Sequence, residues 1–470
     1  METKKYHILT LGCQMNKSDS ERVDSVLSGL GWTSVDTEDE AALVVVNSCA
    51  VRQSAMDRIF GRFKIWNKRR AKGELKVLLT GCVLDQDKKR MMPHVDWFLP
   101  IKDLSTLPAL LGYPELDLGE YFEVKPNYNN TFSAFVPIMT GCDKFCTFCA
   151  VPYTRGREIS RPYTQILKEI EQLVRNGCRE ITLLGQNVNS YVGAPDRTVS
   201  DREVRGVGKI IMNLRRRVAG HGGEGQAHRP APTPVALQGT IDFPQLLQKI
   251  ADIPGDFWIR FLTSHPYDMS DELVEVMAGN PKICKQLNLP VQSGDDEILK
   301  KMNRHYTVEY YLERVRKIRE RLPNIALSTD IIVGFCGESD RAFGKTAEVF
   351  RAANYDMAFL SEYSTRPGTA AAKLFADDVS GEVKTKRKEE LNEILKSQAF
   401  SYNQRFMGRT IRVLVDKSEQ KGELFLNSGR NEEAKPIQFL AGRDYTGQFV
   451  DVEVTKTGAW NLEGILSKFD

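Results

Sequence analysis

The stretch Thr140-Gly-Cys-Asp-Lys-Phe-Cys-Thr-Phe-Cys-Ala-Val-Pro152 decides which fold and chemistry this chain can have. It holds Cys142, Cys146 and Cys149 in a Cys-x3-Cys-x2-Cys run. A cubane 4Fe-4S cluster needs a ligand on each iron, so three cysteines this close leave one iron open to a small molecule. Zinc is the alternative, but structural zinc sites usually close all four positions with a second Cys-x2-Cys pair, and none follows here. The spacing favours an iron-sulfur cluster over zinc or unligated thiols.

The run resembles the signature of the radical S-adenosylmethionine (radical SAM) enzymes. Phe148, just before the third cysteine, matches the aromatic residue usual at that place, and Gly141 would let the loop close around a cluster. The resemblance implies that the open iron binds the amino and carboxylate groups of SAM. It also implies that the reduced cluster cleaves SAM to a 5'-deoxyadenosyl radical, so the cofactor supplies the difficult chemistry.

Length and composition predict a soluble chain of about three domains, because 470 residues with 41% apolar content can bury ample core. Nine cysteines, an odd number, fit metal ligation in a reducing compartment better than a disulfide framework, so we expect a cytoplasmic protein. The N-terminus does not read as a secretory signal, and no run is apolar enough to span a bilayer. The net charge of +3 is too small to identify a nucleic-acid partner.

Residues 1–125 are predicted to form a Rossmann-like domain with a parallel sheet. Apolar runs alternate with helical patterns there, in the order of a βαβαβ unit. The apolar runs are 6–11, 43–46 and 76–80, and the helical patterns are 18–30 and 53–70. The sequence Ser18-Asp-Ser-Glu21 has the pattern of a capping box, which predicts the start of the first helix.

Each of these three predicted strands leads to a cysteine, namely Cys13, Cys49 and Cys82. The carboxyl ends of parallel strands lie along one edge of a sheet, where ligands bind, so these distant cysteines are expected to converge there. A single cysteine at a strand end is more often a small buried thiol. The repetition at three strand ends favours a second metal site.

With both trios in view, the chain resembles the methylthiotransferases over nearly its whole length. The matching first-domain segments are Thr10-Leu-Gly-Cys-Gln-Met-Asn16, Asn47-Ser-Cys-Ala-Val-Arg52 and Gly81-Cys82. The resemblance implies that Cys13, Cys49 and Cys82 hold an auxiliary 4Fe-4S cluster, where sulfur is methylated and then delivered. It further implies two SAM molecules, one donating a methyl group and one forming the radical.

Residues 130–380 are predicted to form a radical SAM βα half-barrel, because strand and helix patterns continue after the cysteine loop. The predicted strands are 180–186, 258–263, 286–292, 327–335 and 357–363. Polar residues at the ends of these strands are candidates for cofactor binding, since enzymes with βα-barrels have their active sites at the carboxyl ends of the strands. The residues assigned to cofactor binding are Phe148, Gln186, Asn187, Gln292, Asp330 and Gly334, the last through its resemblance to the family's glycine motif. No general base is assigned.

Two shorter segments, Leu183–Tyr191 and Cys142–Arg157, most closely resemble the MiaB subgroup. That subgroup adds a methylthio group to C2 of N6-isopentenyladenosine at position 37 of tRNA, next to the anticodon. Two related substrates stay open, threonylcarbamoyl-adenosine in tRNA and an aspartate of a ribosomal protein. A zinc-containing RNA-binding protein without catalysis is the alternative from another class.

Residues 400–468 are predicted to form a small antiparallel β-barrel that resembles the TRAM RNA-binding domain, most clearly over Gly447–Val454. The basic residues that could contact phosphates there, or form an ordinary charged surface, are Arg409, Arg412, Lys417, Lys421, Arg430 and Lys456. Residues 193–239 read as an inserted loop, since they are rich in Gly and Pro and lack an apolar period.

Three arginines follow the cysteine loop, Arg155, Arg157 and Arg161. They could meet phosphate or a cofactor carboxylate, or form ion pairs within the barrel. The family resemblance implies further partners: a tRNA anticodon stem-loop, an electron donor such as flavodoxin or ferredoxin, and a sulfur donor. We expect a monomer that does not bind a membrane.

Overall fold

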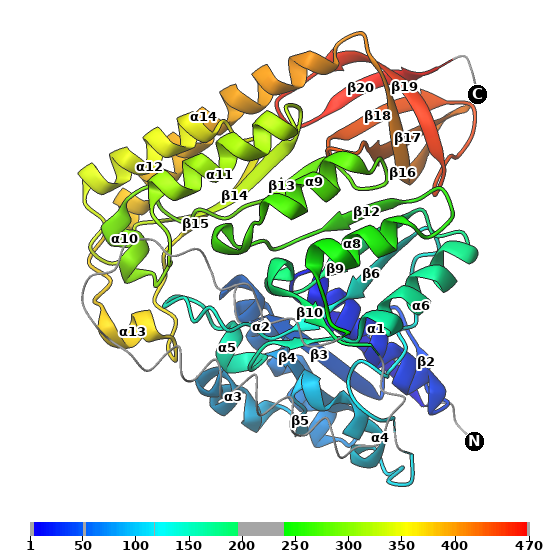
Figure 1. The fold of residues 1–470 in the computed structure, drawn as a ribbon. Helices are drawn as coiled ribbons and strands as arrows, with labels where there is room; N and C mark the ends of the chain where they lie inside the picture. Colours follow the sequence, from blue (N-terminus) through cyan, green and yellow to red (C-terminus); the bar gives the residue numbers. More distant parts are fainter. Residues whose placement is uncertain (1–3, 50–52, 117, 196–238, 468–470) are drawn as a thin grey trace.

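The computed structural model describes residues 4–49, 53–116, 118–195 and 239–467. It shows an N-terminal domain with a parallel sheet, a central domain of parallel strands and helices, and a C-terminal closed barrel (Figure 1). The predicted fold class is therefore confirmed. Within the described ranges, none of the helices is long and apolar enough to cross a membrane.

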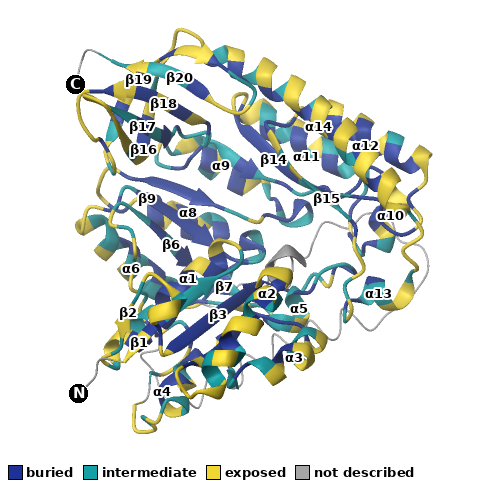
Figure 2. Ribbon diagram, turned by 180° about the vertical axis from the view of Figure 1, so that it is seen from behind, coloured by how far each residue is buried: buried dark blue, intermediate teal, exposed yellow. Residues whose placement is uncertain are grey.

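The N-terminal sheet has five parallel strands in the order β2-β1-β3-β4-β5. Its central strand β3 is buried along its whole length (Figure 2), because Val45 packs under α1 while Val44 and Val46 pack under α2. The elements are β1 (Lys5–Thr10), α1 (Gln14–Gly29), β2 (Thr33–Ser34), η1 (Glu38–Glu40), β3 (Leu43–Cys49), α2 (Gln53–Ala71), β4 (Lys76–Cys82), α3 (Asp85–Met91), η2 (Met92–His94), β5 (Trp97–Phe98), η3 (Ile101–Thr106) and α4 (Leu107–Leu110).

The predicted start of the first helix is wrong. Helix α1 begins at Gln14, with Cys13 as its N-cap and Asn16 in the capping-box position. Ser18 and Glu21 lie inside the helix and are buried. The pattern misled because the helix already begins four residues before Ser18, so the N–H groups that Ser18 would cap are bonded within the helix.

The central domain contains two three-stranded parallel sheets, β12-β9-β6 and β13-β14-β15, joined by a single backbone bridge between Ile259 and Ile283. One large apolar core joins these strands to the surrounding helices. The elements are β6 (Ser133–Pro137), β7 (Met139–Thr140), α5 (Val151–Thr154), β8 (Ile159–Ser160), α6 (Tyr163–Arg175), β9 (Glu180–Leu184), η4 (Val188–Ser190), β10 (Val192–Gly193), β11 (Ile241–Asp242), α8 (Phe243–Ala251), β12 (Trp258–Phe261), η5 (Pro266–Asp268), α9 (Asp271–Gly279), β13 (Gln286–Asn288), α10 (Asp296–Lys301), α11 (Val308–Arg321), β14 (Ala326–Val333), α12 (Asp340–Ala353), β15 (Met357–Glu362), α13 (Ala370–Leu374) and α14 (Gly381–Asn403).

The strand before the cysteine loop, β6, was not predicted. It forms the edge of its sheet beside β9, and α1 of the N-terminal domain packs against it. The two ends of the predicted insertion pair with each other, since β10 and β11 are antiparallel neighbours. Residues 196–238 of that insertion lie outside the described residues, as do Ala50–Arg52 of the second matching segment.

The C-terminal barrel closes in the order β16-β17-β18-β20-β19. Its elements, after the turn η6 (Gln404–Phe406), are β16 (Thr410–Lys421), β17 (Leu424–Arg430), β18 (Pro436–Ala441), β19 (Phe449–Thr457) and β20 (Leu462–Leu466). The barrel is not antiparallel throughout, because β18 and β20 are parallel. A closed ring with an odd number of strands cannot alternate direction at every pair, so one parallel pair is unavoidable. The strands predicted from the sequence, 411–415, 423–426, 437–440 and 449–454, fall on β16 to β19, whereas the last strand, β20, was not predicted.

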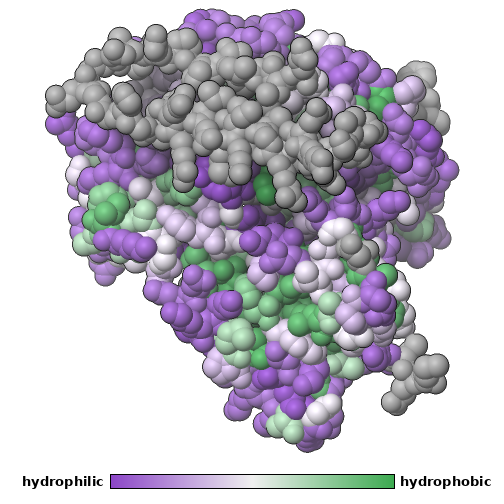
Figure 3. All heavy atoms as spheres, turned by 60° about the horizontal axis from the view of Figure 1, so that its bottom comes forward, coloured by the Kyte–Doolittle hydropathy of each residue, from purple (hydrophilic) through white to green (hydrophobic). Residues whose placement is uncertain are grey.

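The end of the molecule that carries the N-terminal domain exposes hydrophilic areas mixed with smaller hydrophobic ones (Figure 3). Such a mixture is ordinary for a folded domain, because more than half of a protein's exposed surface comes from apolar atoms. This face therefore gives no clear sign of a docking partner by its hydropathy.

Candidate functional site

The first three cysteines gather at the carboxyl edge of the N-terminal sheet. Cys49 and Cys82 end β3 and β4 and lie opposite each other in register, and Cys13 follows β1 as the N-cap of α1. Burial raises the pKa of the Cys82 thiol, Arg155 opposes this, and Cys49 and Cys13 add to the increase. Cys49 and Cys82 thus end adjacent strands, and Cys13 follows the next strand at the same edge, as the strand-end argument predicts.

Two asparagines hold this edge together. Asn16 Nδ2 donates to Asn47 Oδ1 at 2.9 Å and to the Ser48 carbonyl at 3.1 Å, and Asn47 Nδ2 donates back to the Asn16 carbonyl at 2.7 Å. Both side chains are fully buried. Gly12 and Gly81 leave room for them, because an added Cβ would overlap the Asn16 or Asn47 side chain. The sequence analysis gave these asparagines no role, although both stand in the segments that resemble the family.

The second trio lies in the loop between β7 and β8. Gly141 adopts φ +78°, and an added Cβ would overlap the Arg157 carbonyl oxygen, so the loop closes tightly just before Cys142. The Cys149 N–H donates to the Cys146 carbonyl at 3.0 Å, which brings the last two cysteines onto one turn. The predicted role of Gly141 in closing the loop agrees with this geometry.

The loop is anchored to the far half-barrel by the segment after α10. Arg304 Nη1 donates to Cys146 Sγ at 3.3 Å, and its Nε donates to Tyr306 Oη at 2.9 Å. The Thr147 N–H donates to the Met302 carbonyl at 3.1 Å. Sequence reasoning missed Arg304, because no local pattern connects it to a cysteine 158 residues away.

The donor set of each trio suits a soft metal centre. Burial raises the pKa of Cys142 to about 11, and burial followed by the Cys146 charge raises that of Cys149 to about 12. Buried thiolates therefore need a compensating cation, which a metal cluster supplies. Across the described ranges, however, no three His, Cys, Asp or Glu side chains converge as a ready-made metal site.

One of the residues predicted to bind the cofactor, Asn187, is linked through Asp268 to the loop of the second trio. Asn187 Nδ2 donates to Asp268 Oδ2 at 2.6 Å, and Asp268 also pairs with Lys144 of the cysteine loop at 2.6 Å. The carbonyl oxygens of the Gln186 and Asn187 side chains are buried and have no hydrogen-bond partner among the described residues. These orphaned acceptors fit a ligand that brings its own hydrogen-bond donors, such as an ammonium or hydroxyl group.

Gln292 and Asp330 are neighbours on the opposite side, because the Gln292 N–H donates to the Asp330 carbonyl at 2.9 Å. Asp330 lies inside β14 rather than at a strand end, which corrects the sequence expectation. Burial raises the pKa of its carboxyl group, while Asn288 and Arg304 oppose the increase. Gln292 has φ +73°, an unusual conformation for a residue other than glycine.

Phe148 and Gly334 both lie against other side chains of the central domain. Phe148 packs against a cluster that includes Phe335, Cys336 and Tyr363. The Gly334 N–H donates to Glu338 Oε2 at 2.6 Å, and an added Cβ would overlap the Lys384 stem. Protein atoms therefore occupy the space beside the N–H and the α-carbon of Gly334.

The three arginines after the loop all form ion pairs. Arg157 pairs with Asp143 at 2.7 Å and Arg161 with Glu169 at 2.5 Å, both within the central domain. Arg155 instead reaches Asp19 of the N-terminal domain at 2.5 Å. The ion-pair alternative is thus correct, but one of the three pairs joins two domains.

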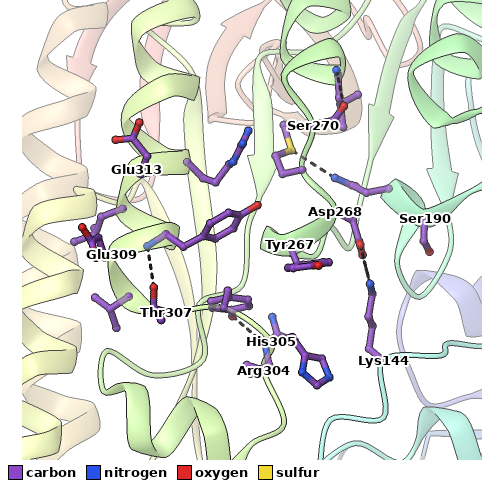
Figure 4. Close-up of a pocket in the computed structure, with 18 of the residues that line it drawn as sticks. Lys144, Ser190, Tyr267, Asp268, Ser270, Arg304, His305, Thr307, Glu309 and Glu313 are labelled. Carbon is purple, nitrogen blue, oxygen red and sulfur yellow. Dashed lines mark hydrogen bonds and ion pairs between the residues drawn. The ribbon is translucent and has the colours of Figure 1, made fainter. Parts of the chain in front are cut away.

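A groove of about 2370 Å³ borders the cysteine loop. In the view of Figure 4, Lys144 and Asp268 point toward one another on one side, and Tyr267 and His305 lie between them and Thr307. The groove is therefore continuous with the outer surface of the cysteine loop and is lined by both acidic and basic side chains.

Comparisons with known proteins found two matching family models, similar solved structures and curated relatives. Residues 136–350 match the model of the radical SAM superfamily, and residues 5–99 match a model described as uncharacterized protein family UPF0004. A solved structure of a radical S-adenosylmethionine methyltransferase, TsrM from Kitasatospora setae, is 14% identical with a TM-score of 0.49, covering 79% of this chain and 75% of that chain. The cysteine loop and the half-barrel define a radical SAM enzyme.

Two curated relatives extend along nearly the whole chain, and both are named tRNA-2-methylthio-N(6)-dimethylallyladenosine synthase. The protein from Carboxydothermus hydrogenoformans is 37% identical over 99% of this chain and 100% of its own length. The one from Phocaeicola vulgatus is 37% identical over 98% of this chain and 96% of its own length. The chain belongs to this family of radical SAM methylthiotransferases. Membership favours an enzyme over the alternative of a zinc protein without catalysis.

Proposed function

We propose that this chain adds a methylthio group to C2 of N6-isopentenyladenosine at position 37 of tRNA, next to the anticodon. The names of the relatives support this substrate over threonylcarbamoyl-adenosine or a ribosomal aspartate. The observation that carries the proposal is the placement of two cysteine trios on neighbouring domains. Ala150, the residue after Cys149, packs with Cys82 in one buried cluster. The two sites are therefore close enough to act on one base.

In this proposal Cys142, Cys146 and Cys149 hold one 4Fe-4S cluster, and Cys13, Cys49 and Cys82 hold the other. When bound, two clusters and two SAM molecules supply the radical, the sulfur and the methyl group. The chain's own residues fix the ligands in place: Arg304 holds Cys146, and the Asn16–Asn47 pair holds Cys13 near Cys49.

The residues around the second trio are proposed to bind SAM. Gln186 and Asn187 offer buried oxygens to its donor groups, and Asp330 lies near Arg304 on the other side. Phe148, Gln292 and Gly334 shape the surrounding wall. No residue is assigned as a general base, because hydrogen abstraction by a radical needs none.

Two exposed basic residues of the barrel are proposed to meet tRNA phosphates. Four of the six candidates already pair with carboxylates; the pairs are Arg412–Asp256, Lys421–Glu419, Arg430–Glu180 and Lys456–Glu463. Arg409 and Lys417 are exposed, and the described residues show no ion pair for either of them. The target adenine lies in a single-stranded loop, from which a base can swing out at modest cost.

The remaining parts of the proposal concern organisation and partners. Three functional units are proposed at residues 1–125, 130–380 and 400–468. A flavodoxin or ferredoxin would supply electrons, and a separate donor would supply sulfur. The enzyme is proposed to act as a monomer in the cytoplasm.

Iron, sulfide and zinc content per chain after anaerobic reconstitution tests the two sites. The parent should hold about eight irons, and a variant with Cys13, Cys49 and Cys82 all replaced by Ala should hold about four. Cys178→Ala is the control, because it removes another buried cysteine of the central domain and should leave about eight. Zinc with little iron in the parent would contradict the proposal.

Product assays separate the roles of the two trios. Cys146→Ala should abolish 5'-deoxyadenosine formation. Cys49→Ala should leave some 5'-deoxyadenosine but no methylthiolated tRNA. Normal product from either variant would refute the assigned roles.

A further inference from the structure

We propose that Arg155 completes the site of Cys13, Cys49 and Cys82 from the neighbouring domain, as a positioning residue that raises the reduction potential of a cluster bound there. This inference rests on the proposed function, which puts a 4Fe-4S cluster at that trio. Nothing in the local sequence indicates the contact, because Arg155 follows the other cysteine trio along the chain.

The contacts of Arg155 cross the boundary between the two domains. Its Nε donates to Cys82 Sγ at 3.0 Å, and its Nη2 pairs with Asp19 Oδ2 at 2.5 Å. The side chains of Arg155 and Asp19 are 2% and 0% exposed. A surface ion pair contributes little, but a buried guanidinium between a carboxylate and a thiol is strongly held, because removing either partner leaves an uncompensated charge.

A second layer of contacts fixes this geometry. The other oxygen of Asp19 accepts a hydrogen bond from Tyr121 Oη at 2.5 Å, and the Arg22 guanidinium lies 5.4 Å from the centre of the Tyr121 ring. The guanidinium of Arg155 therefore has little freedom to turn away from Cys82.

The same short segment also carries the other trio. Arg155 is the C-cap of α5, the helix that begins two residues after Cys149. The segment that follows Cys149 of one trio thus carries a side chain that contacts Cys82 of the other.

One nitrogen of the Arg155 guanidinium makes no hydrogen bond within the described residues. This nitrogen, Nη1, is buried. A buried N–H without a partner is costly, so this donor is available to an anionic sulfur ligand at the open iron. Hydrogen bonds to cluster sulfurs and a nearby positive charge stabilise the more negative, reduced state, which raises the reduction potential.

The test uses the full-length chain with Cys142, Cys146 and Cys149 replaced by Ala, so that only the first trio can hold a cluster. In this background Arg155→Met removes the charge and the hydrogen bonds, and Arg155→Lys keeps the charge but loses the planar fork of donors that reaches Cys82 and Asp19 together. Arg161→Met is the matched control, because it breaks a buried ion pair of the same length with Glu169. The measurements are the midpoint potential from an EPR-monitored redox titration, the iron content, and the rate of iron loss to a chelator.

We expect Arg155→Met to shift the potential to more negative values and to speed iron loss several-fold. Arg155→Lys should give an intermediate shift, and Arg161→Met should leave the potential at the parent value even if it melts at a lower temperature. An unshifted potential in an iron-loaded Arg155→Met protein would overturn this inference but not the proposed function. Absence of iron from the background protein itself would overturn both. If Arg155→Met does not fold, Arg155→Lys decides, and an unshifted potential there overturns the inference.

Discussion

At the scale of single residues, backbone conformation decides whether the cysteine loop can close. Gly141 and Gly156 face each other across the neck of this loop, with φ values of +78° and +81°. They differ in their surroundings: a Cβ on Gly141 would overlap the Arg157 carbonyl, whereas a Cβ on Gly156 would meet nothing within 4 Å. Only Gly141 is therefore required for both conformation and space.

This difference predicts unequal effects of two alanine substitutions. Gly156→Ala should cost about 1–2 kcal/mol, the price of a left-handed conformation for an L-residue. Gly141→Ala should cost more and should open the loop, so that iron falls from about eight to about four per chain. Urea unfolding and iron analysis of the two proteins check this. Full iron occupancy in Gly141→Ala would show that the loop can close without a glycine.

At the scale of elements, the first trio depends on how α1 meets β3. Cys13 lies at the start of α1 and Cys49 at the end of β3, and the Asn16–Asn47 hydrogen bonds join these two ends. Asn47 Nδ2 also donates to Ser20 Oγ at 2.9 Å. Since the side chains of Asn16, Asn47 and Ser20 are buried, water cannot replace a lost partner there.

Asn47→Ala should therefore destabilise the protein by about 1–3 kcal/mol and release the first trio, because the buried Asn16 loses one acceptor of its side-chain amide and the donor to its carbonyl. Iron content should fall from about eight to about four per chain. Asn403→Ala is the matched control, since Asn403 is buried and donates to the Gly458 and Ala459 carbonyls at 2.9 and 3.1 Å in the C-terminal part. That variant should lose stability but keep its iron. Equal iron in both variants would argue against a special role of the Asn16–Asn47 pair.

At the scale of the whole molecule, one buried charge cluster attaches the barrel to the central domain. Arg260 pairs with Glu180 at 2.5 Å and donates to the carbonyls of Asn431 and Glu432 at 2.7 and 3.0 Å. Arg430 of the barrel reaches the same carboxylate at 3.1 Å. Burial alone would raise the pKa of Glu180, but Arg260 and Arg430 lower it below its usual value.

Arg260→Met should destabilise the chain by about 1–3 kcal/mol near neutral pH, because it removes one of the two cations beside the buried Glu180 carboxylate and the hydrogen bonds to the Asn431 and Glu432 carbonyls. A carboxylate with a lowered pKa contributes stability above the unfolded pKa, here near 4.5, and loses that contribution as pH falls through the folded pKa. The penalty should therefore shrink below about pH 4.5. Denaturant titrations at pH 4 and pH 7 measure it, and limited proteolysis should release the barrel from the variant first.

Arg316→Met serves as the control for this experiment. Arg316 pairs with Glu313 at 2.7 Å on the exposed face of α11, and such surface pairs contribute little to stability. A penalty of the same size in both variants would mean that the Arg260 cluster is no stronger than a surface ion pair.

The sequence predictions that the structure confirmed all depend on local residue patterns. Alternating apolar runs indicated the parallel sheets, and cysteines at the ends of β3 and β4 were correctly expected to meet, because parallel strands align their carboxyl ends. The start of α1 was wrong, because Ser18 and Glu21 match a capping pattern but lie inside the helix. β6 and β20 were missed, since β6 ends at Pro137 and β20 contains Gly464, and both residue types are depleted in strands.

The sequence by itself determined the class of chemistry, because the type and spacing of the metal ligands are local properties of short segments such as Cys142–Cys149. Only the tertiary structure decided how the two trios relate. Arg155 meets Cys82 across 73 residues, and Arg304 meets Cys146 across 158. These contacts depend on how separate domains pack, and packing selects partners by shape and burial rather than by position along the chain.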